Sequence, residues 1–218
     1  MNVGIREIDM IRVKGHRACR QENEFRGHRA RGPIGASNEG RVRIDETRSA
    51  LHVVHAMPVE IRVDTLDLLP LPGVVFKHFT ARDVVSRWDV LEVHTRATAR
   101  AAAAFLDAIE ARMPFPVRAI QVDGGSEFQA QFEQECQRRQ IRLFVLPPRS
   151  PKLNGSVERA QRTHTEEFYE VWDLTWAVPE LNRQLRAWEE VYNTVRPHQS
   201  LGQRTPERFL HELAVAST

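Results

Sequence analysis

Cysteine is nearly absent from this sequence: Cys19 and Cys136 are the only two in 218 residues. Neither has the neighbours or the spacing of a metal-ligand set, so neither a disulfide framework nor a zinc site is expected. No apolar run approaches the roughly 20 residues of a membrane span, and the N-terminus lacks the apolar stretch of a secretory signal. These absences predict a cytoplasmic protein with a reduced interior and no membrane partner.

Lysine is also scarce, because Lys77 and Lys152 are the only lysines after residue 50. Residues 1–50 carry 11 Lys and Arg against 7 Asp and Glu, whereas the remaining residues carry 20 against 22. The body of the chain is therefore not a uniformly basic nucleic-acid binder. Any attraction to phosphate there must come from local patches, and arginine supplies most of the candidates.

The first part of the chain, residues 1–57, shows no sustained period of 2 or 3.6 and has few large apolar residues. That composition favours a loop or a poorly structured arm. Two alternatives stay open at this point: a basic arm that helps to hold DNA, and the remnant of an upstream domain. Residues 58–218 are predicted to form one domain with a helical C-terminal extension.

Periodicity in residues 58–218 predicts strands followed by alternating strands and helices. The first strand alternates apolar Val59, Ile61 and Val63 with polar residues. The Ala-rich segment 97–113 has Phe105, Leu106 and Ile109 at helical spacing. Strands are expected within 59–68, 71–80, 86–95, 117–123 and 141–148, and helices within 97–113, 127–141, 154–172 and 179–195. This order predicts an α/β fold, a mixed five-stranded sheet with helices on its faces.

Three acidic residues occupy similar places in this arrangement. Asp64 lies toward the end of the first strand, Asp123 ends the fourth, and Glu158 lies near the start of a helix. Strand ends and helix starts converge in such sheets, so one cluster of carboxylates is feasible. Oxygen ligands without cysteine select Mg²⁺ or Mn²⁺, and two such ions support phosphoryl transfer.

Each acid also has an ordinary structural explanation. A single Asp after a strand is more often a turn or cap residue, and Glu158 favours a helix N-terminus electrostatically. Asp67, Asp83 and Glu127 have similar local claims to a catalytic role. The residues alone therefore leave the choice among the acids open.

Four sequence motifs, in this order along the chain, narrow the choice among the acidic residues: "IRVDTLDL", "IQVDGGSEF", "PPRSPKLNGSVERAQRTHTEEFY" and "YNTVRPHQSLGQRTPERFL". Together they resemble the integrase catalytic core of insertion-sequence transposases, relatives of retroviral integrases with an RNase H-like fold. Glu158 follows Asp123 by 35 positions, the separation typical of that family. The resemblance runs from about residue 58 to the C-terminus.

The resemblance implies a DDE-type enzyme with Asp64, Asp123 and Glu158 as catalytic and metal-binding residues. It implies a polynucleotidyl transferase that uses Mg²⁺ or Mn²⁺, with two ions, to cut transposon ends and join them to target DNA. Gly124 departs from the family, which usually has Asn there. The two glycines Gly124 and Gly125 are expected to allow a close backbone approach or a positive φ angle.

Lys152, Arg159 and Arg162 are the expected DNA-binding residues, with a mobile loop over 147–155 hinged at Asn154-Gly155. Arg162 is equally explained as an i,i+4 partner of Glu158 on a solvated helix surface. Trp188 and Tyr192 are expected to be packing residues. Arg196 and His198 are explained either by contact with DNA or a sister subunit, or by a buried, hydrogen-bonded cap on the domain.

The implied partners are transposon-end and target DNA and further copies of the chain, because two DNA ends must be joined. The helix-turn-helix region that such transposases carry upstream is not evident, so a separate helix-turn-helix domain or polypeptide is a possible partner. A bacterial, nucleoid-associated location in the cytoplasm is expected. The alternative is an inactive, truncated transposase that binds DNA or inhibits the full-length enzyme; a plain RNase H-like nuclease is disfavoured by the last of the four motifs.

Overall fold

A mixed sheet of five strands lies at the centre of the computed structural model, which describes residues 60–146 and 151–216, with side chains from 61–146 and 155–216. Arm residues 1–57 and loop residues 147–150 lie outside the described part. Among the described helices, none is long and apolar enough to cross a membrane. The strands are β1 (Glu60–Leu71), β2 (Val74–Asp83), β3 (Asp89–His94), β4 (Ala119–Val122) and β5 (Arg142–Val145).

The strand order is β3-β2-β1-β4-β5. β1, β2 and β3 form an antiparallel meander, and β4 and β5 add to it in parallel. Leu71 pairs with Val74, so Pro72 and Gly73 alone turn the chain between β1 and β2. Gly73 has a φ of +81°, a backbone conformation that is unfavourable for a residue with a side chain. The predicted mixed five-stranded sheet is confirmed.

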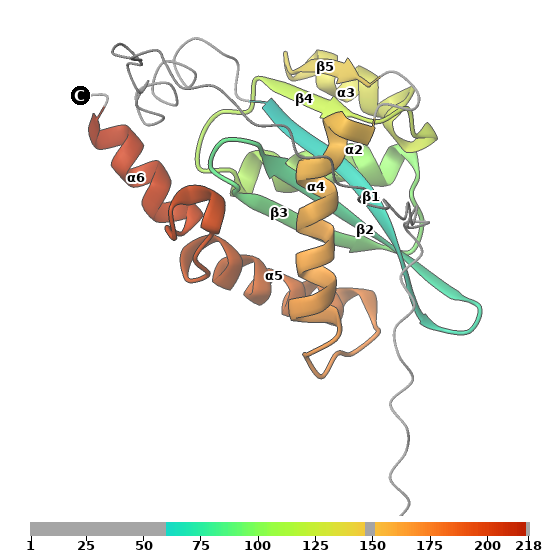
Figure 1. Cartoon of the computed structure of the whole chain (residues 1–218). Coiled ribbons are helices and arrows are strands. Elements are labelled where there is room, and N and C mark those ends of the chain that lie inside the picture. Colours follow the sequence, from blue (N-terminus) through green and yellow to red (C-terminus); the bar gives the residue numbers. More distant parts are fainter. Residues whose placement is uncertain (1–59, 147–150, 217–218) are drawn as a thin grey trace, which may run out of the picture.

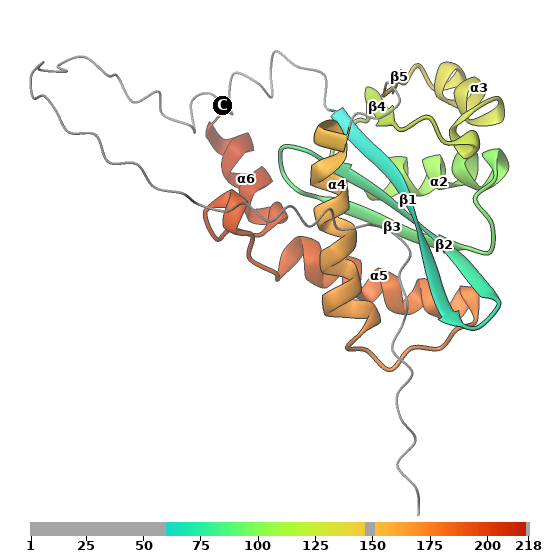
Figure 2. The same ribbon diagram turned by 45° about the vertical axis from the view of Figure 1, so that its right-hand side comes forward.

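Helices cover both faces of the sheet (Figures 1 and 2). α2 (Ala99–Arg112) and α3 (Gln131–Arg138) lie on one face, and α4 (Pro151–His164) and α5 (Val178–Thr194) lie on the other. The side chains of each strand alternate between these two layers. In β1, Ile61 and Val63 therefore face α2, whereas Leu66 and Leu68 face α5.

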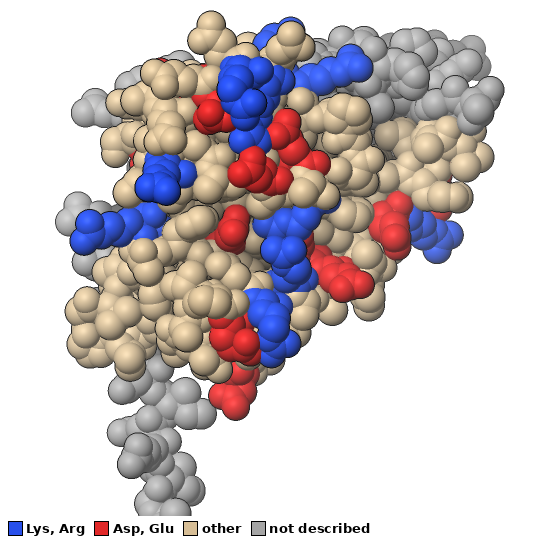
Figure 3. All heavy atoms as spheres, turned by 180° about the vertical axis from the view of Figure 1, so that it is seen from behind, with Lys and Arg blue, Asp and Glu red and all other residues tan. Residues whose placement is uncertain are grey.

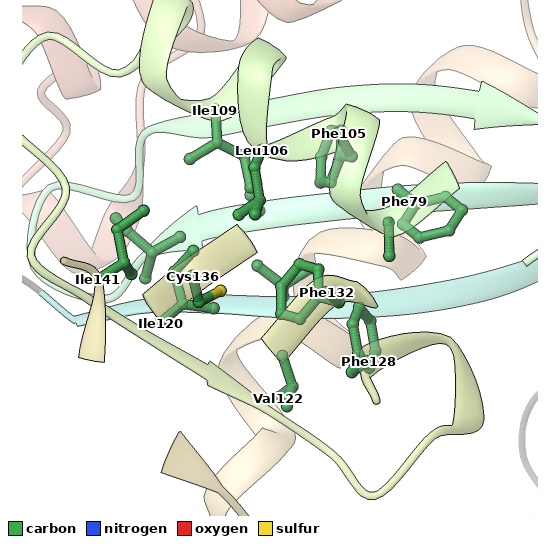
Figure 4. Packing of buried hydrophobic residues seen from close by; sticks show 14 of the residues in the cluster. Phe79, Phe105, Leu106, Ile109, Ile120, Val122, Phe128, Phe132, Cys136 and Ile141 are labelled. Carbon is green, nitrogen blue, oxygen red and sulfur yellow. The ribbon is translucent and has the colours of Figure 1, made fainter. Parts of the chain in front are cut away.

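The core between the sheet and α2 and α3 is aromatic and aliphatic (Figure 4). Phe79 of β2 packs against Phe105 of α2, with ring centroids 5.5 Å apart, and Phe132 of α3 packs on Phe128. Cys136 belongs to this core, and burial raises the pKa of its thiol to about 12. The thiol is therefore a small apolar side chain and not a reactive one.

A second core lies between the sheet and α5. Leu66, Leu68 and Leu91 of the sheet pack there against residues of α5 and of the π-helical turn η2 (Thr165–Tyr169) that continues α4. Trp188 and Tyr192 are 5% and 2% exposed, which confirms that they are packing residues.

Three segments differ from the sequence prediction. The helix expected over 127–141 is split into η1 (Ser126–Phe128) and α3, because Ala130 has a φ of +49°. α4 begins at Pro151, so Asn154 and Gly155 are helical and the expected hinge is wrong. Proline is favoured in the first turn of a helix, where its missing N–H has no partner to lose. The short η3 (Gln199–Leu201) and the helix α6 (Pro206–Ala216) had not been predicted individually.

The aromatic core generates the first prediction. Replacing the fully buried Phe105 by alanine removes its ring contacts and leaves a cavity, so we expect a loss of about 3–5 kcal/mol in the free energy of unfolding. Phe144→Ala is the matched control, because Phe144 is 48% exposed on β5. Urea denaturation followed by circular dichroism measures both losses. Equal losses in the two variants would contradict the assignment of Phe105 to the core.

Candidate active site

Asp64 lies within β1 and Asp123 directly follows the neighbouring parallel strand β4. The expectation that Asp64 lies toward the end of its strand is wrong, because β1 continues to Leu71 by pairing with β2. Val63 of β1 pairs with Val122 of β4, and the two aspartates are the next residues along. Both valines face α2 and α3, so alternation turns Asp64 and Asp123 toward the opposite face, where α4 lies. Each is half-buried, and each accepts a backbone N–H: Asp64 from Thr65 at 2.8 Å and Asp123 from Gly125 at 3.0 Å.

Glu158 reaches the same face of the sheet from α4. That helix packs against β1 and β2, with Val157 and Ala160 fully buried on either side of the half-buried Glu158. The structure thus brings the three predicted acids to one face from three separate elements. Within residues 61–146 and 155–216, however, no three His, Cys, Asp or Glu side chains are grouped closely enough to hold a metal ion.

The donor chemistry of the three acids fits a hard divalent cation. Carboxylate oxygens are the ligands that Mg²⁺ and Mn²⁺ prefer, and half-buried acids on rigid elements keep their oxygens accessible. Neither sulfur nor imidazole belongs to this set of three. The three acids therefore have the donor chemistry for such an ion, although the described residues do not bring three acids together as a metal site.

Glu127 is a fourth acid beside Asp123. Its Oε1 accepts a hydrogen bond of 2.8 Å from Thr65 Oγ1, so it is tied to the residue that follows Asp64. A Cβ on Gly125 would lie 2.8 Å from Glu127 Oε2 and 2.9 Å from Asp123 Oδ1. The two carboxylates thus border the same small space. From sequence Glu127 was only a rival candidate, because its contact with Thr65 joins residues 62 positions apart.

The two glycines after Asp123 differ in role. Gly125 has a φ of −61°, but the carboxylates of Asp123 and Glu127 leave no room for a side chain there. A Cβ on Gly124 would meet nothing within 4 Å. The expected close approach therefore holds for Gly125 and not for Gly124, and neither glycine has a positive φ.

The other two rival acids have structural roles. Asp67 pairs with Lys77 across the β1–β2 hairpin. Asp83 is buried and accepts hydrogen bonds from the backbone N–H and the hydroxyl of Ser86, at 2.7 Å and 2.6 Å. These bonds stabilise the tight turn between β2 and β3. Both residues are thereby explained without catalysis.

A buried polar network holds α4 against the sheet. Arg82 of β2 is 4% exposed, with its Nε 3.0 Å from Asp89 Oδ1. Its Nη1 donates to the carbonyl oxygen of Ser156 at 3.0 Å, and its Nη2 donates to the Tyr192 hydroxyl at 2.6 Å. One guanidinium therefore connects the sheet with α4, two residues before Glu158, and with α5.

His164 completes this network from the end of α4. Trp188 Nε1 donates to His164 Nδ1 at 3.0 Å, and an indole nitrogen is only a donor. Nδ1 is therefore unprotonated, and Nε2–H donates to Asp89 Oδ2 at 3.1 Å. Burial lowers the pKa of His164, which agrees with this neutral form.

Two of the three predicted DNA-binding residues lie beside Glu158. Arg159 and Arg162 are exposed and line, with Glu158, a hollow of about 570 Å³ on α4. The side chain of Lys152 lies outside the described residues.

Arg196 borders the same hollow and forms an ion pair with Glu167. His198 is buried, and its Nε2 lies 3.3 Å from the backbone oxygen of Tyr192. His198 is thus part of a buried cap on the domain.

Comparisons with known proteins show which proteins this chain is similar to. Residues 139–206 match the family model of the integrase core domain, a span that includes Glu158 but neither aspartate. The candidate integrase ORF3 of Spiroplasma virus SpV1-C74 is 31% identical over 109 residues, which are 44% of this chain and 30% of that protein. The chain therefore spans less than a third of this curated relative.

Two solved structures share the fold. The catalytic core domain of BIV integrase has a TM-score of 0.57 at 21% identity, covering 74% of this chain and 99% of that one. A chain of the simian T-cell lymphotropic virus intasome complex with PP2A regulatory subunit B56 gamma has a TM-score of 0.59 at 19% identity, covering 71% of this chain and 54% of that one. The RNase H-like architecture expected from the sequence is confirmed.

The neutral His164 predicts an acid-sensitive fold. Below a pH of about 6.5 the unfolded chain gains a proton that the folded His164 resists, so stability falls as the pH falls. We expect the stability advantage of the wild type over His164→Gln to shrink between pH 7 and pH 5, by at most about 1.4 kcal/mol per pH unit. Urea unfolding across this range measures it. A difference in unfolding free energy between the two proteins that stays constant over this pH range would show that His164 does not contribute to the pH dependence of stability.

Proposed function

We propose that the chain is a DNA transposase or integrase core of the DDE type, which cuts phosphodiester bonds at transposon ends and joins the freed ends to target DNA. Its match to the integrase core domain and its fold support the proposal. The observation that carries the proposal is the placement of Asp64, Asp123 and Glu158 on one face of the sheet, from β1, from the end of β4 and from α4. Each cut releases a 3′ hydroxyl, which then attacks a target phosphodiester. One bond breaks for each bond that forms, so no external energy source is needed.

The residues of the site have distinct proposed roles. Asp64, Asp123 and Glu158 would hold one or two Mg²⁺ or Mn²⁺ ions, which supply activation of the attacking oxygen and stabilisation of the leaving one. Arg159 and Arg162 bind backbone phosphates beside Glu158 and orient the strand. Glu127 accepts a hydrogen bond from Thr65 and borders the same small space as Asp123. Its role is to hold the segment after β4 in position beside β1.

The partners follow from the same chemistry. The substrate is DNA, both the transposon end and the target. Two ends must be joined, so an assembly of several copies of the chain is proposed; a structural neighbour comes from an intasome. Recognition of the end sequence is assigned to a separate helix-turn-helix domain or polypeptide, and the place of action to the bacterial nucleoid.

An inactive DNA-binding or inhibitory product is the alternative. Two observations favour it: Gly124 stands where the resembling family usually has Asn, and the acids of the described part are not grouped as a metal cluster. The exposed arginines of α4 would bind DNA in either case. Measured catalysis therefore separates the two functions, and DNA binding alone does not.

Asp123→Asn and Glu158→Gln test the proposal. Each change keeps the shape of the side chain and removes its charge, so we expect metal-dependent nicking and strand transfer to fall by more than about 100-fold, beyond the loss typical of an outer-shell residue. Labelled DNA duplexes incubated with Mg²⁺ or Mn²⁺ and separated on denaturing gels measure the products.

Glu170→Gln is the matched control, because Glu170 is exposed beyond the end of α4 and outside the hollow. It is expected to keep wild-type activity. If the folded wild type nicks no DNA with either metal, the inactive alternative replaces the proposal. If Asp123→Asn retains full activity, the assignment of that acid is wrong.

A further inference from the structure

A second hollow lies on the other side of α4 from Glu158 and has not been given a role above. It has a volume of about 540 Å³ and is bounded by α4, by the turn between β2 and β3, and by the segment that follows α5. Twelve residues line it; four are arginines and none is Asp or Glu. Arg159, Thr163 and Arg196 border both hollows, so the two are separated only by a strip of α4.

The charge of this hollow is not balanced by its surroundings. Arg82 is paired with Asp89, and Arg196 is paired with Glu167. Among the described residues, neither Arg87 nor Arg159 forms an ion pair with a carboxylate. Burial and the nearby Arg82 lower the pKa of Arg87, whereas Asp83 and Asp89 raise it.

The backbone fixes the position of Arg87. It lies in the turn between β2 and β3 with a φ of +65°, a conformation that a non-glycine residue adopts at a cost and that recurs at functional sites. Its N–H donates to the carbonyl of Asp83, and its Nη1 donates to the hydroxyl of Ser156 at 2.9 Å. The guanidinium is thereby held against α4, half-buried at the rim of the hollow.

The neutral lining adds hydrogen-bond donors to this charge. Ser156, Thr163, Gln199, Ser200 and Gln203 all carry side-chain donors. The opposite side of the molecule is different, because basic and acidic side chains are interspersed there (Figure 3). On that side Arg139 of α3, for example, pairs with Asp107, Glu110 and Glu135. The lining of the hollow, in contrast, contains no acidic residue.

We infer that this hollow, the Arg87 pocket, binds a backbone phosphate of the DNA strand that crosses α4 next to Glu158. The inference rests on the proposed function for the identity of the ligand. Arg87 and Arg159 contact the phosphate oxygens, and the buried Arg82–Asp89 pair holds the wall behind them. The contact is to the backbone, so it positions the strand without reading its sequence.

Arg87→Gln and Arg159→Gln test the pocket, and Arg87→Gln is the decisive variant because Arg159 also borders the hollow beside Glu158. Arg138→Gln is the matched control. Arg138 is exposed on α3, on the opposite face of the sheet, and its loss changes the net charge equally. Affinity for short labelled DNA is measured by fluorescence anisotropy at several salt concentrations without divalent metal, so that no cleavage occurs. Each pocket variant is expected to bind about tenfold more weakly for every sequence tested. The slope of log affinity against log salt is expected to become shallower by roughly 0.7–0.9.

Thermal unfolding with added inorganic phosphate identifies the ligand. Phosphate is expected to raise the Tm of the wild type and of Arg138→Gln more than that of Arg87→Gln. Should phosphate stabilise the wild type while the pocket variants keep full DNA affinity, the pocket is a site for free phosphate and the DNA assignment is wrong.

The remaining outcomes separate the pocket from the proposed function. If the wild type nicks DNA and the pocket variants bind it as Arg138→Gln does, the pocket is overturned and the function stands. If the wild type nicks no DNA but the pocket variants lose affinity, the pocket stands and the function fails. A folded wild type that binds neither DNA nor phosphate overturns both.

Discussion

The buried ion pair between Arg82 and Asp89 is the interaction on which the candidate site depends. A guanidinium removed from water requires compensation for its charge, and Arg82 obtains it from an ion pair with Asp89 in the sheet and from hydrogen bonds to α4 and α5. Such a pair contributes little net stability, but loss of one partner leaves a buried charge and typically costs about 3–5 kcal/mol. The placement of α4 and α5 in this structure satisfies it through Ser156 and Tyr192.

That placement decides where the acids stand relative to one another. Asp64 and Asp123 are placed by strand pairing alone, because the register of β1 and β4 sets them side by side. Glu158 has no such register, since helix packing on a sheet permits sliding. The bond from Arg82 to the Ser156 carbonyl and the contacts of His164 with Asp89 and Trp188 remove that freedom. Polar contacts of α4 on both sides of Glu158 along the chain, at Ser156 and at His164, thus fix the position of its carboxylate.

The sequence was sufficient for the parts of the structure that follow local rules. Alternation and helical spacing predicted every strand and the helices α2, α4 and α5, and the order of motifs indicated the three acids. Prediction from the sequence failed where contacts between residues that are distant in the sequence determine the structure. Nothing near Ala130 marks its positive φ, and the contact between Thr65 of β1 and Glu127 of η1 joins two elements that are distant in the sequence. The Arg87 pocket combines a turn, a helix face and a C-terminal segment, which no window of sequence contains.

The division of the sheet into two cores has a consequence for truncation of the chain. The core under α2 and α3 uses only residues up to Leu143, so all of its residues precede α4 in the chain. The opposite face, with Leu66, Leu68, Leu91 and Val93, is covered by residues of η2 and α5, which come later. A chain that stopped before residue 151 would therefore lack Glu158 and leave this apolar face of the sheet uncovered.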